Sequence, residues 1–261
     1  PIDSLGKTAK INTKQQKIEV LTLLATFLVL LSAVYLSYVF YPEIEKLQLQ
    51  YLNTSWGTTF IIVTTILFVI KISFLLFNFV LYLIYKQAKA VSDNELPTCL
   101  VIVPAYNEGN LVYHTLLSVA QSDYPSHKLE ILAIDDGSKD DTWDWMKKAK
   151  AVLGNRVILH QQPKNMGKRH ALYYGFKNAI SEVVVTIDSD SIIEKDTLKN
   201  LVSPFVINKK CGAVAGNVKV LNTAKAIIPK MLDVSFAFSF EFIRSAQSTL
   251  GSVFCTPGAL A

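Results

Sequence analysis

Residues 183–191 read Val-Val-Val-Thr-Ile-Asp-Ser-Asp-Ser, an apolar run that stops at two carboxylates. Successive β-branched residues of this kind are typical of a strand buried on both faces, as in a parallel sheet. Ligands of open α/β sheets bind at the carboxyl ends of the strands, where Asp188 and Asp190 would stand. Mg²⁺ and Mn²⁺ favour oxygen ligands, and Mg²⁺ is usually held by one or two carboxylates with substrate phosphates. The stretch therefore predicts a metal and diphosphate site, and its alternative is a solvated acidic turn.

From Thr98 onward, short apolar runs alternate with longer amphipathic ones. The short runs predict strands at residues 99–103, 129–134, 157–160, 183–187 and 213–215. The amphipathic stretches predict helices at residues 110–121, 142–153, 168–181, 195–208 and 223–250. This alternation is typical of an α/β fold in which helices cover both faces of a mainly parallel sheet.

Polar segments follow the first four predicted strands. They are Pro-Ala-Tyr-Asn-Glu at 104–108, Asp-Asp-Gly-Ser at 135–138, Asn-Met-Gly-Lys-Arg-His at 165–170, and the Asp-Ser-Asp already quoted. A glycine lets backbone approach a ligand, and the cations Lys168 and Arg169 suit phosphate. Each segment alone has a simpler interpretation as a turn, a helix cap or a solvated loop. Together at one edge of a sheet, they indicate a nucleotide-diphosphate site.

The first third of the chain is more apolar than the rest. Residues 20–40 carry no charge, and a helix of this length spans the roughly 30 Å hydrocarbon core of a bilayer. Residues 60–85 form a second long run, interrupted by Lys71, which would reach for headgroups or an intramembrane partner. The first run is too long for a signal peptide and does not end in small residues. The sequence therefore predicts two transmembrane helices within residues 18–85.

The charges around these two runs predict their orientation. Four lysines precede the first run and two follow the second, whereas residues 42–57 between them carry one lysine and two glutamates. The positive-inside rule then places residues 1–17 in the cytoplasm and the short loop between the two runs outside. We therefore expect a multi-pass protein of the plasma membrane. A cytoplasmic linker at 86–97 and a cytoplasmic domain at 98–261 follow. The net charge of +5 mostly reflects the flanking lysines, which favours an anionic lipid surface over nucleic acid.

The cysteines and histidines of the sequence form no recognisable metal or disulfide pattern. Cys99, Cys211 and Cys255 are odd in number, widely spaced and in apolar surroundings, which is typical of buried thiols in a reducing compartment. The four histidines lack metal-ligand spacing. A metal in this chain is therefore expected on the carboxylates.

The four polar segments, in this order, resemble those of membrane-embedded family 2 glycosyltransferases. The most similar group contains hyaluronan synthases, chitin synthase-like enzymes and poly-N-acetylglucosamine synthases. Two further segments agree: residues 216–222 read Gly-Asn-Val-Lys-Val-Leu-Asn, and Ser-Ala-Gln-Ser at 245–248 leads to Phe-Cys-Thr-Pro-Gly-Ala-Leu at 254–260. The resemblance covers residues 98–261 and implies a GT-A-type fold. It also implies a processive, inverting transfer of N-acetylglucosamine from a UDP-sugar to a saccharide acceptor, with Mg²⁺ or Mn²⁺.

The resemblance implies a role for each of several residues. The uridine pocket would contain Ala105, Tyr106 and Glu108, with Asp135 on the uracil and Asp136 supporting its loop. The diphosphate would meet Lys168 and Arg169, while Asp188 would help hold both nucleotide and metal, and Asp190 would coordinate the metal. Residues near the donor sugar and acceptor would be Asn217, Lys219, Cys255, Thr256, Pro257 and Gly258.

Members of this group also have an acidic general base, a Gln-x-x-Arg-Trp motif and further transmembrane helices, and none of these occurs before Ala261. We therefore expect a portion of a longer synthase, in which donor binding is encoded here and full catalysis is not. Two alternatives stay open. One is a non-processive membrane glycosyltransferase acting on a lipid carrier, and the other is a nucleotide-binding membrane protein without turnover.

Overall fold

The structure is a computed structural model of the 261-residue chain, and it describes residue 28, residues 31–221, residues 227–254 and residue 260. The chain divides into two compact units, Pro1–Phe74 and Leu75–Ala261. The described residues of the first unit are mostly helical, and the second unit contains the sheet domain.

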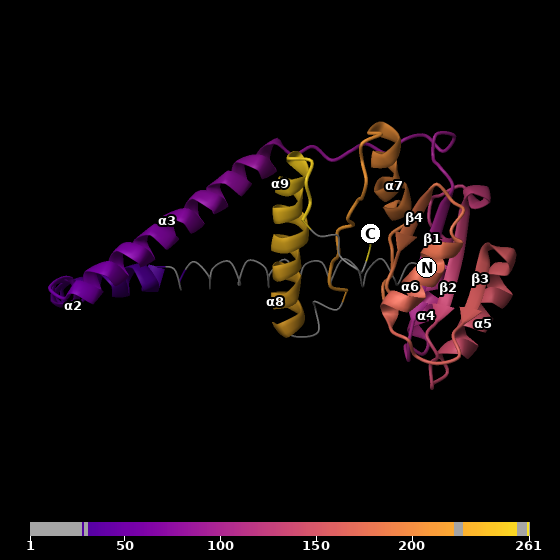
Figure 1. Cartoon of the computed structure of the whole chain (residues 1–261), viewed down its shortest axis with the longest axis horizontal. Helices are drawn as coiled ribbons and strands as arrows, with labels where there is room; N and C mark the ends of the chain where they lie inside the picture. The colour runs from indigo at the N-terminus through magenta and orange to yellow at the C-terminus, as the bar shows by residue number, and fades with distance from the viewer. Residues whose placement is uncertain (1–27, 29–30, 222–226, 255–259, 261) are drawn as a thin grey trace, which may run out of the picture. The chain divides into compact units, whose positions relative to one another are not determined.

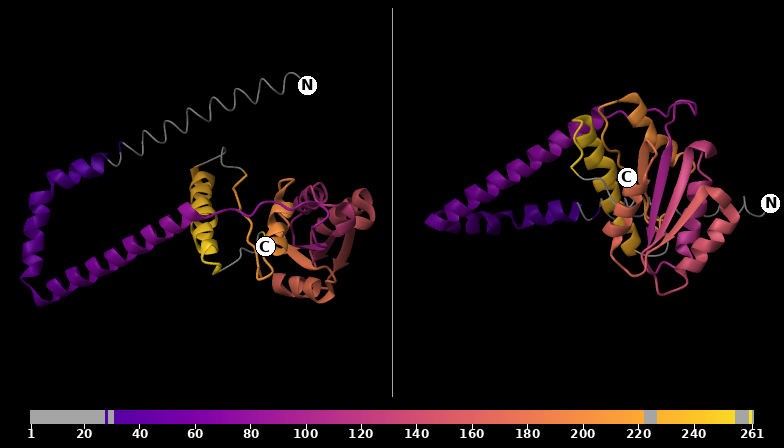
Figure 2. Two further views of the ribbon diagram at one scale, coloured as in Figure 1. Left: turned by 90° about the horizontal axis from the view of Figure 1, so that it is seen from above. Right: turned by 45° about the vertical axis from the view of Figure 1, so that its right-hand side comes forward.

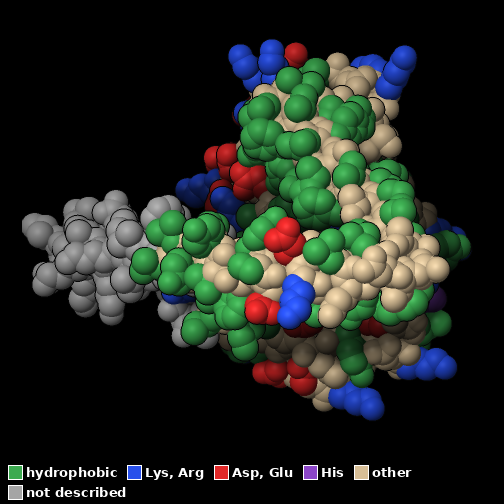
Figure 3. Space-filling view, turned by 90° about the vertical axis from the view of Figure 1, so that its left-hand side faces the viewer, with side chains coloured by type: hydrophobic (Ala, Val, Ile, Leu, Met, Phe, Trp, Pro, Cys, Tyr) green, Lys and Arg blue, Asp and Glu red, His purple; other side chains and the backbone are tan. Residues whose placement is uncertain are grey.

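The described part of the first unit contains residues 31–39, which are helical, followed by α2 (Tyr41–Leu52) and most of α3 (Ser55–Ile84). Among the described residues, α3 is the one helix that is long and apolar enough to cross a membrane. Apolar side chains along it, such as Phe60 and Phe68, are exposed, and hydrophobic side chains are prominent on the face drawn in Figure 3. Helix α3 contains the second predicted span, whereas most of residues 20–40 lie outside the described residues.

The segment between the two apolar runs is mostly helical. Helix α2 occupies it, with Pro42 in the first turn. A proline is tolerated there because the first backbone N–H groups of a helix have no intrahelical partner. Glu43 near the start of α2 also interacts favourably with the helix dipole.

Four parallel strands form the sheet of the second unit: β1 (Cys99–Ala105), β2 (Leu129–Asp135), β3 (Val157–Gln161) and β4 (Val183–Thr186). Their order is β3-β2-β1-β4 (Figure 1). The register pairs Ala105 with Asp135, and Asp135 with Gln161. The first four strand predictions are confirmed, and their polar segments begin at one edge of the sheet.

Helices cover both faces of this sheet, as the alternating pattern predicted (Figure 2). Alternate β1 residues such as Val101 pack against α4 (Leu111–Ala120), α5 (Thr142–Leu153) and α7 (Thr197–Ile207) in one core. On the other face, Leu100 and Ile102 pack against α6 (Lys168–Asn178). A Cβ on Gly175 of α6 would lie 2.5 Å from the Cδ1 atom of Ile102, so the absent side chain permits this close packing.

The predicted strand at residues 213–215 does not form. Residues of this segment and of β4, Val214 and Val184 among them, line a cavity of about 240 Å³. Instead, Leu260 forms an isolated antiparallel bridge with Ile187 just after β4. The N–H of Gly216 donates to the carbonyl of Leu260 at 3.1 Å.

The described part of the long helix predicted at residues 223–250 is helical but not uniformly α-helical. It consists of α8 (Ile227–Phe236), the π-helical segment η3 (Ala237–Ile243) and α9 (Arg244–Thr249). Residues 223–226 lie outside the described residues. The predicted α-helical geometry, with 3.6 residues per turn, is therefore found in α8 and α9, whereas η3 between them has more residues per turn.

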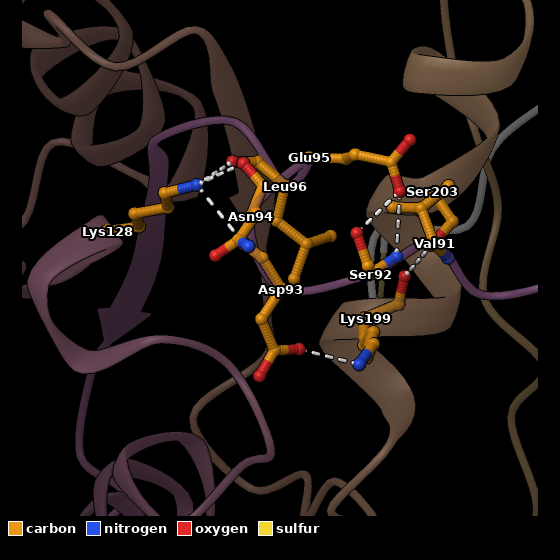
Figure 4. A network of polar contacts seen from close by, with 9 residues as sticks. All are labelled: Val91, Ser92, Asp93, Asn94, Glu95, Leu96, Lys128, Lys199 and Ser203. Atoms are coloured by element: carbon orange, nitrogen blue, oxygen red, sulfur yellow. Dashed lines mark hydrogen bonds and ion pairs between the residues drawn. The ribbon is translucent and has the colours of Figure 1, made fainter.

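Hydrogen bonds and an ion pair join the second half of the predicted linker to the sheet domain (Figure 4). Lys128, at the end of the short helix η1 (Ser126–Lys128), donates to three carbonyl groups, those of Asp93 at 3.1 Å, Asn94 at 2.9 Å and Leu96 at 2.7 Å. From α7, the ammonium of Lys199 pairs with the Asp93 carboxylate at 2.6 Å. The Ser203 hydroxyl accepts a hydrogen bond from the N–H of Val91 at 3.0 Å. This part of the linker is therefore structurally part of the domain.

Candidate active site

A cavity of about 320 Å³ lies at the carboxyl edge of the sheet. It is lined by Pro104, Ala105, Tyr106, Glu108, Asp136, Asn165, Gly167, Lys168, Asp188, Ser189 and Asp190. These residues come from the end of β1 and from the segments after β1, β2, β3 and β4, so the structure brings all four polar segments together. Seven of the predicted site residues line this one cavity.

Asp135 and Asp136 at the end of β2 are both almost fully buried, but they make different contacts. The Asp135 carboxylate accepts hydrogen bonds from the Ser138 N–H at 3.0 Å and the Gln161 side-chain amide at 2.8 Å. The Asp136 carboxylate accepts the N–H groups of Met166 at 2.9 Å and Gly167 at 2.8 Å. Asp136 thus connects the loop after β2 to the loop after β3. Asp135 does not line the cavity.

The loop after β3 presents a helix N-terminus and a cation to the cavity. Gly167 caps α6 with φ of 90°, a conformation that favours glycine, and Lys168 is the first residue of α6. The Lys168 ammonium forms an ion pair with the Asp188 carboxylate, and both side chains are partly exposed. Free N–H groups at a helix N-terminus and a lysine together suit the oxygens of a phosphate group.

The carboxylates of the cavity are close enough to repel one another. The pKa of Glu108 is raised by burial first and then by the negative charges of Asp190, Asp140 and Asp188, and a hydrogen bond with Ser189 partly opposes the shift. The described residues contain no group of three or more acidic, cysteine or histidine side chains arranged to hold a metal on their own. Two carboxylates, Asp188 and Asp190, that line the cavity nevertheless fit Mg²⁺ or Mn²⁺, because substrate phosphates complete such sites.

A buried threonine that was not among the predicted site residues organises the loop after β1. The Thr142 hydroxyl, at the start of α5, accepts hydrogen bonds from the N–H groups of Glu108 at 2.8 Å and Gly109 at 2.9 Å. It also donates to the Asp140 carboxylate at 2.6 Å. The sequence signal predicted only a helix cap here. The structure shows that the hydroxyl instead fixes a backbone segment from another loop.

Besides Asp135, three predicted site residues are described but do not line the cavity. Arg169, Asn217 and Lys219 are all exposed. Four others, Cys255, Thr256, Pro257 and Gly258, lie outside the described residues. Asn165, Gly167 and Ser189 do line the cavity, and they belong to the predicted segments although they had no individual role.

Residues 100–260 match the family described as Glycosyl transferase family 2, which is more than half of the chain. The chain therefore belongs to glycosyl transferase family 2, and it carries a glycosyltransferase domain with an α/β fold and a parallel sheet.

Relatives of known name agree with this assignment. The chain is 31% identical over 175 residues to an N-acetylglucosaminyltransferase of Rhizobium leguminosarum bv. viciae, covering 67% of this chain and 41% of that protein. It is also 31% identical over 163 residues to a poly-beta-1,6-N-acetyl-D-glucosamine synthase of Staphylococcus aureus, covering 62% of this chain and 38% of that protein. The chain thus spans less than half the length of these relatives.

A solved structure is similar over much of the chain. It is the mannosyltransferase PcManGT from Pyrobaculum calidifontis in complex with GDP-Man and Mn²⁺. The TM-score is 0.58 at 27% identity, over 71% of this chain and 50% of that one. This relative of the same fold therefore holds a nucleotide sugar together with a divalent metal ion.

Proposed function

We propose that the chain is the donor-binding part of a processive, inverting β-glycosyltransferase that extends a polysaccharide at the plasma membrane. The donor would be a UDP-sugar, with UDP-N-acetylglucosamine as first choice. The observation that carries this proposal is the cavity in which Lys168, Asp188 and Asp190 meet beside the N-terminus of α6. It combines a cation, helix N–H groups and carboxylates as a nucleotide diphosphate requires.

In the proposed reaction, an acceptor hydroxyl oxygen bonds to the anomeric carbon while the bond from that carbon to the diphosphate oxygen breaks. The electron pair leaves with UDP, so negative charge grows on the diphosphate. Lys168 and the first N–H groups of α6 would stabilise that charge. Asp188 and Asp190 would hold Mg²⁺ or Mn²⁺, which supplies further charge neutralisation when bound. The proton of the acceptor hydroxyl would pass to a general base, and we assign none among the cavity residues, since their carboxylates serve the nucleotide and the metal.

The nucleoside would lie against Ala105, Tyr106 and Glu108, which line the cavity after β1. Tyr106 is partly exposed and offers an aromatic face for a base. Asp135 would support this part of the site through its hydrogen bonds with the Ser138 N–H and the Gln161 side-chain amide. Asn217, Lys219 and the 255–258 segment would serve the sugar and acceptor, and Arg169 the outer side of the diphosphate.

The relatives support N-acetylglucosamine as the transferred sugar, because two of them are named for its transfer or polymerisation. In the test, membranes containing the full-length protein are incubated with radiolabelled donors, singly and in pairs. The donors are UDP-N-acetylglucosamine, UDP-glucuronate, UDP-glucose and GDP-mannose. We expect polymer from UDP-N-acetylglucosamine alone. A strict need for UDP-glucuronate as well would select a hyaluronan synthase, and product only from UDP-glucose or GDP-mannose would refute the donor assignment.

Product size separates the remaining alternatives. A processive enzyme gives long polymer even when little donor has been consumed, whereas a non-processive enzyme acting on a lipid carrier gives a short, solvent-extractable product. A nucleotide-binding protein without turnover would bind UDP and metal but release no UDP from any donor sugar.

The membrane topology is a second proposal, supported by the apolar helix α3 and by the lysines on both flanks. We propose a multi-pass protein with the sheet domain in the cytoplasm. Cysteines introduced at the exposed positions Gln50 and Ser92 should then react with an impermeant thiol reagent from opposite sides, Gln50 from outside. Labelling of both positions from the same side of intact cells would exclude this topology.

A further inference from the structure

Helix α4 lies beside the loop that follows β4 and is bonded to it at successive points. The Thr115 hydroxyl donates to the carbonyl of Ser189 at 2.7 Å. One turn further along α4, the Ser118 hydroxyl accepts a hydrogen bond from the Ile193 N–H at 3.3 Å. Just beyond the helix, the N–H of Asp123 donates to the carbonyl of Lys195 at 2.7 Å. The partners are far apart in sequence, so these contacts are tertiary and none is a local cap.

The first of these bonds lies deepest. Thr115 is fully buried, and Ser189 is 5% exposed. A helical threonine commonly bonds the carbonyl four residues earlier, and the Thr115 hydroxyl does approach that of Leu111, at 3.3 Å. The bond to Ser189 is shorter by 0.6 Å, the difference between 3.3 and 2.7 Å, so the hydroxyl serves mainly the loop. Its acceptor belongs to the residue between Asp188 and Asp190.

We propose that Thr115, supported by Ser118, is a positioning residue for the two carboxylates of the cavity. This inference rests on the proposed function, in which Asp188 and Asp190 hold a divalent cation with the donor diphosphate. The two side chains can face the same cavity only if the Ser189 peptide group between them keeps its orientation. The Thr115 hydroxyl fixes that orientation from a rigid helix, and Ser118 fixes the loop three residues past Asp190.

Thr115→Val tests this directly, because valine keeps the shape and removes the donor. A buried carbonyl without a partner is costly, so the Ser189 peptide group is expected to turn and carry Asp190 with it. We expect the dissociation constant of Mn²⁺ in the presence of UDP to rise by about 10-fold or more, the usual effect of removing a group that orients a metal ligand. Thr115→Ser keeps the hydroxyl and should restore nearly wild-type affinity. Free Mn²⁺ is measured by electron paramagnetic resonance, with full-length protein in detergent.

Ser203→Ala is the matched control. Ser203 is also fully buried, and its hydroxyl likewise bonds a segment far away in sequence, because it accepts a hydrogen bond from the Val91 N–H at 3.0 Å. Its loss should lower the melting temperature and leave Mn²⁺ affinity unchanged. A purely structural role for Thr115 would make Thr115→Val behave in the same way, and that result would overturn the inference.

The outcomes separate this inference from the proposed function. Wild-type protein that binds UDP equally well with and without Mn²⁺ would refute the metal site itself. Wild-type protein with metal-dependent binding, and unchanged Mn²⁺ affinity in both Thr115→Val and Ser118→Ala, would refute only the positioning role. If Thr115→Val does not fold, Ser118→Ala decides: weakened Mn²⁺ binding supports the role and unchanged binding refutes it.

Discussion

Asp190→Asn is expected to lower turnover of the full-length protein by about two orders of magnitude and to remove the metal dependence of UDP binding. Asparagine has nearly the volume of aspartate but no charge, so it would hold a divalent cation poorly. Asp190 is exposed and lines the cavity, which means that its substitution should leave the melting temperature almost unchanged. UDP is titrated with and without Mn²⁺ or Mg²⁺, and initial rates are measured across metal concentrations.

Asp144→Asn is the control for this substitution. Asp144 is an exposed aspartate of α5 whose partner is Lys147 at 2.6 Å, and it does not line the cavity. An exposed pair of this kind contributes little to stability, so both rate and metal dependence should stay as in the wild type. Equal metal dependence in Asp190→Asn and the wild type would show that the cation, if any, is held elsewhere.

Most of the fold was predictable because its signals are local. The strands β1, β2 and β4 are apolar runs buried in the sheet, and a polar segment follows each of them. The failure at residues 213–215 has the opposite cause. A short apolar triplet becomes a strand only if a neighbour supplies a ladder, and the partner of Ile187 is Leu260, which no local pattern indicates.

The site was predictable at the level of segments and less so at the level of atoms. Adjacent aspartates at the end of β2 look alike in the sequence, yet Asp136 reaches the loop after β3 and Asp135 bonds Gln161 within the sheet edge. Thr115 and Thr142 gave no signal beyond helix and cap propensity, because the groups that their hydroxyls meet come from other loops. Tertiary partners of this kind become visible only once the strands are in register.

Lys168→Met should lower kcat by about 100-fold, an effect of the size seen when one preorganised donor to a developing negative charge is removed. Methionine preserves the length and apolar stem of lysine but carries no ammonium, so Asp188 would lose its ion-pair partner and the leaving diphosphate a cation. Lys168→Arg keeps the charge with a different geometry, and its kcat should lie between those of the wild type and Lys168→Met. The control is Lys177→Met, an exposed lysine in the last turn of the same helix, which should behave as the wild type.

The division of this effect between rate and binding tests the proposed role of Lys168 most sharply. Charge on the diphosphate grows as the bond to the sugar breaks, so the lysine should stabilise the transition state more than the bound donor. We therefore expect kcat and kcat/KM to fall together, with a smaller loss of affinity for the intact UDP-sugar. UDP itself, which already carries the developed charge, should lose more affinity than the donor does. An unchanged kcat with a raised KM would instead mean that Lys168 binds the donor and its transition state equally, and the proposed part in leaving-group departure would be wrong.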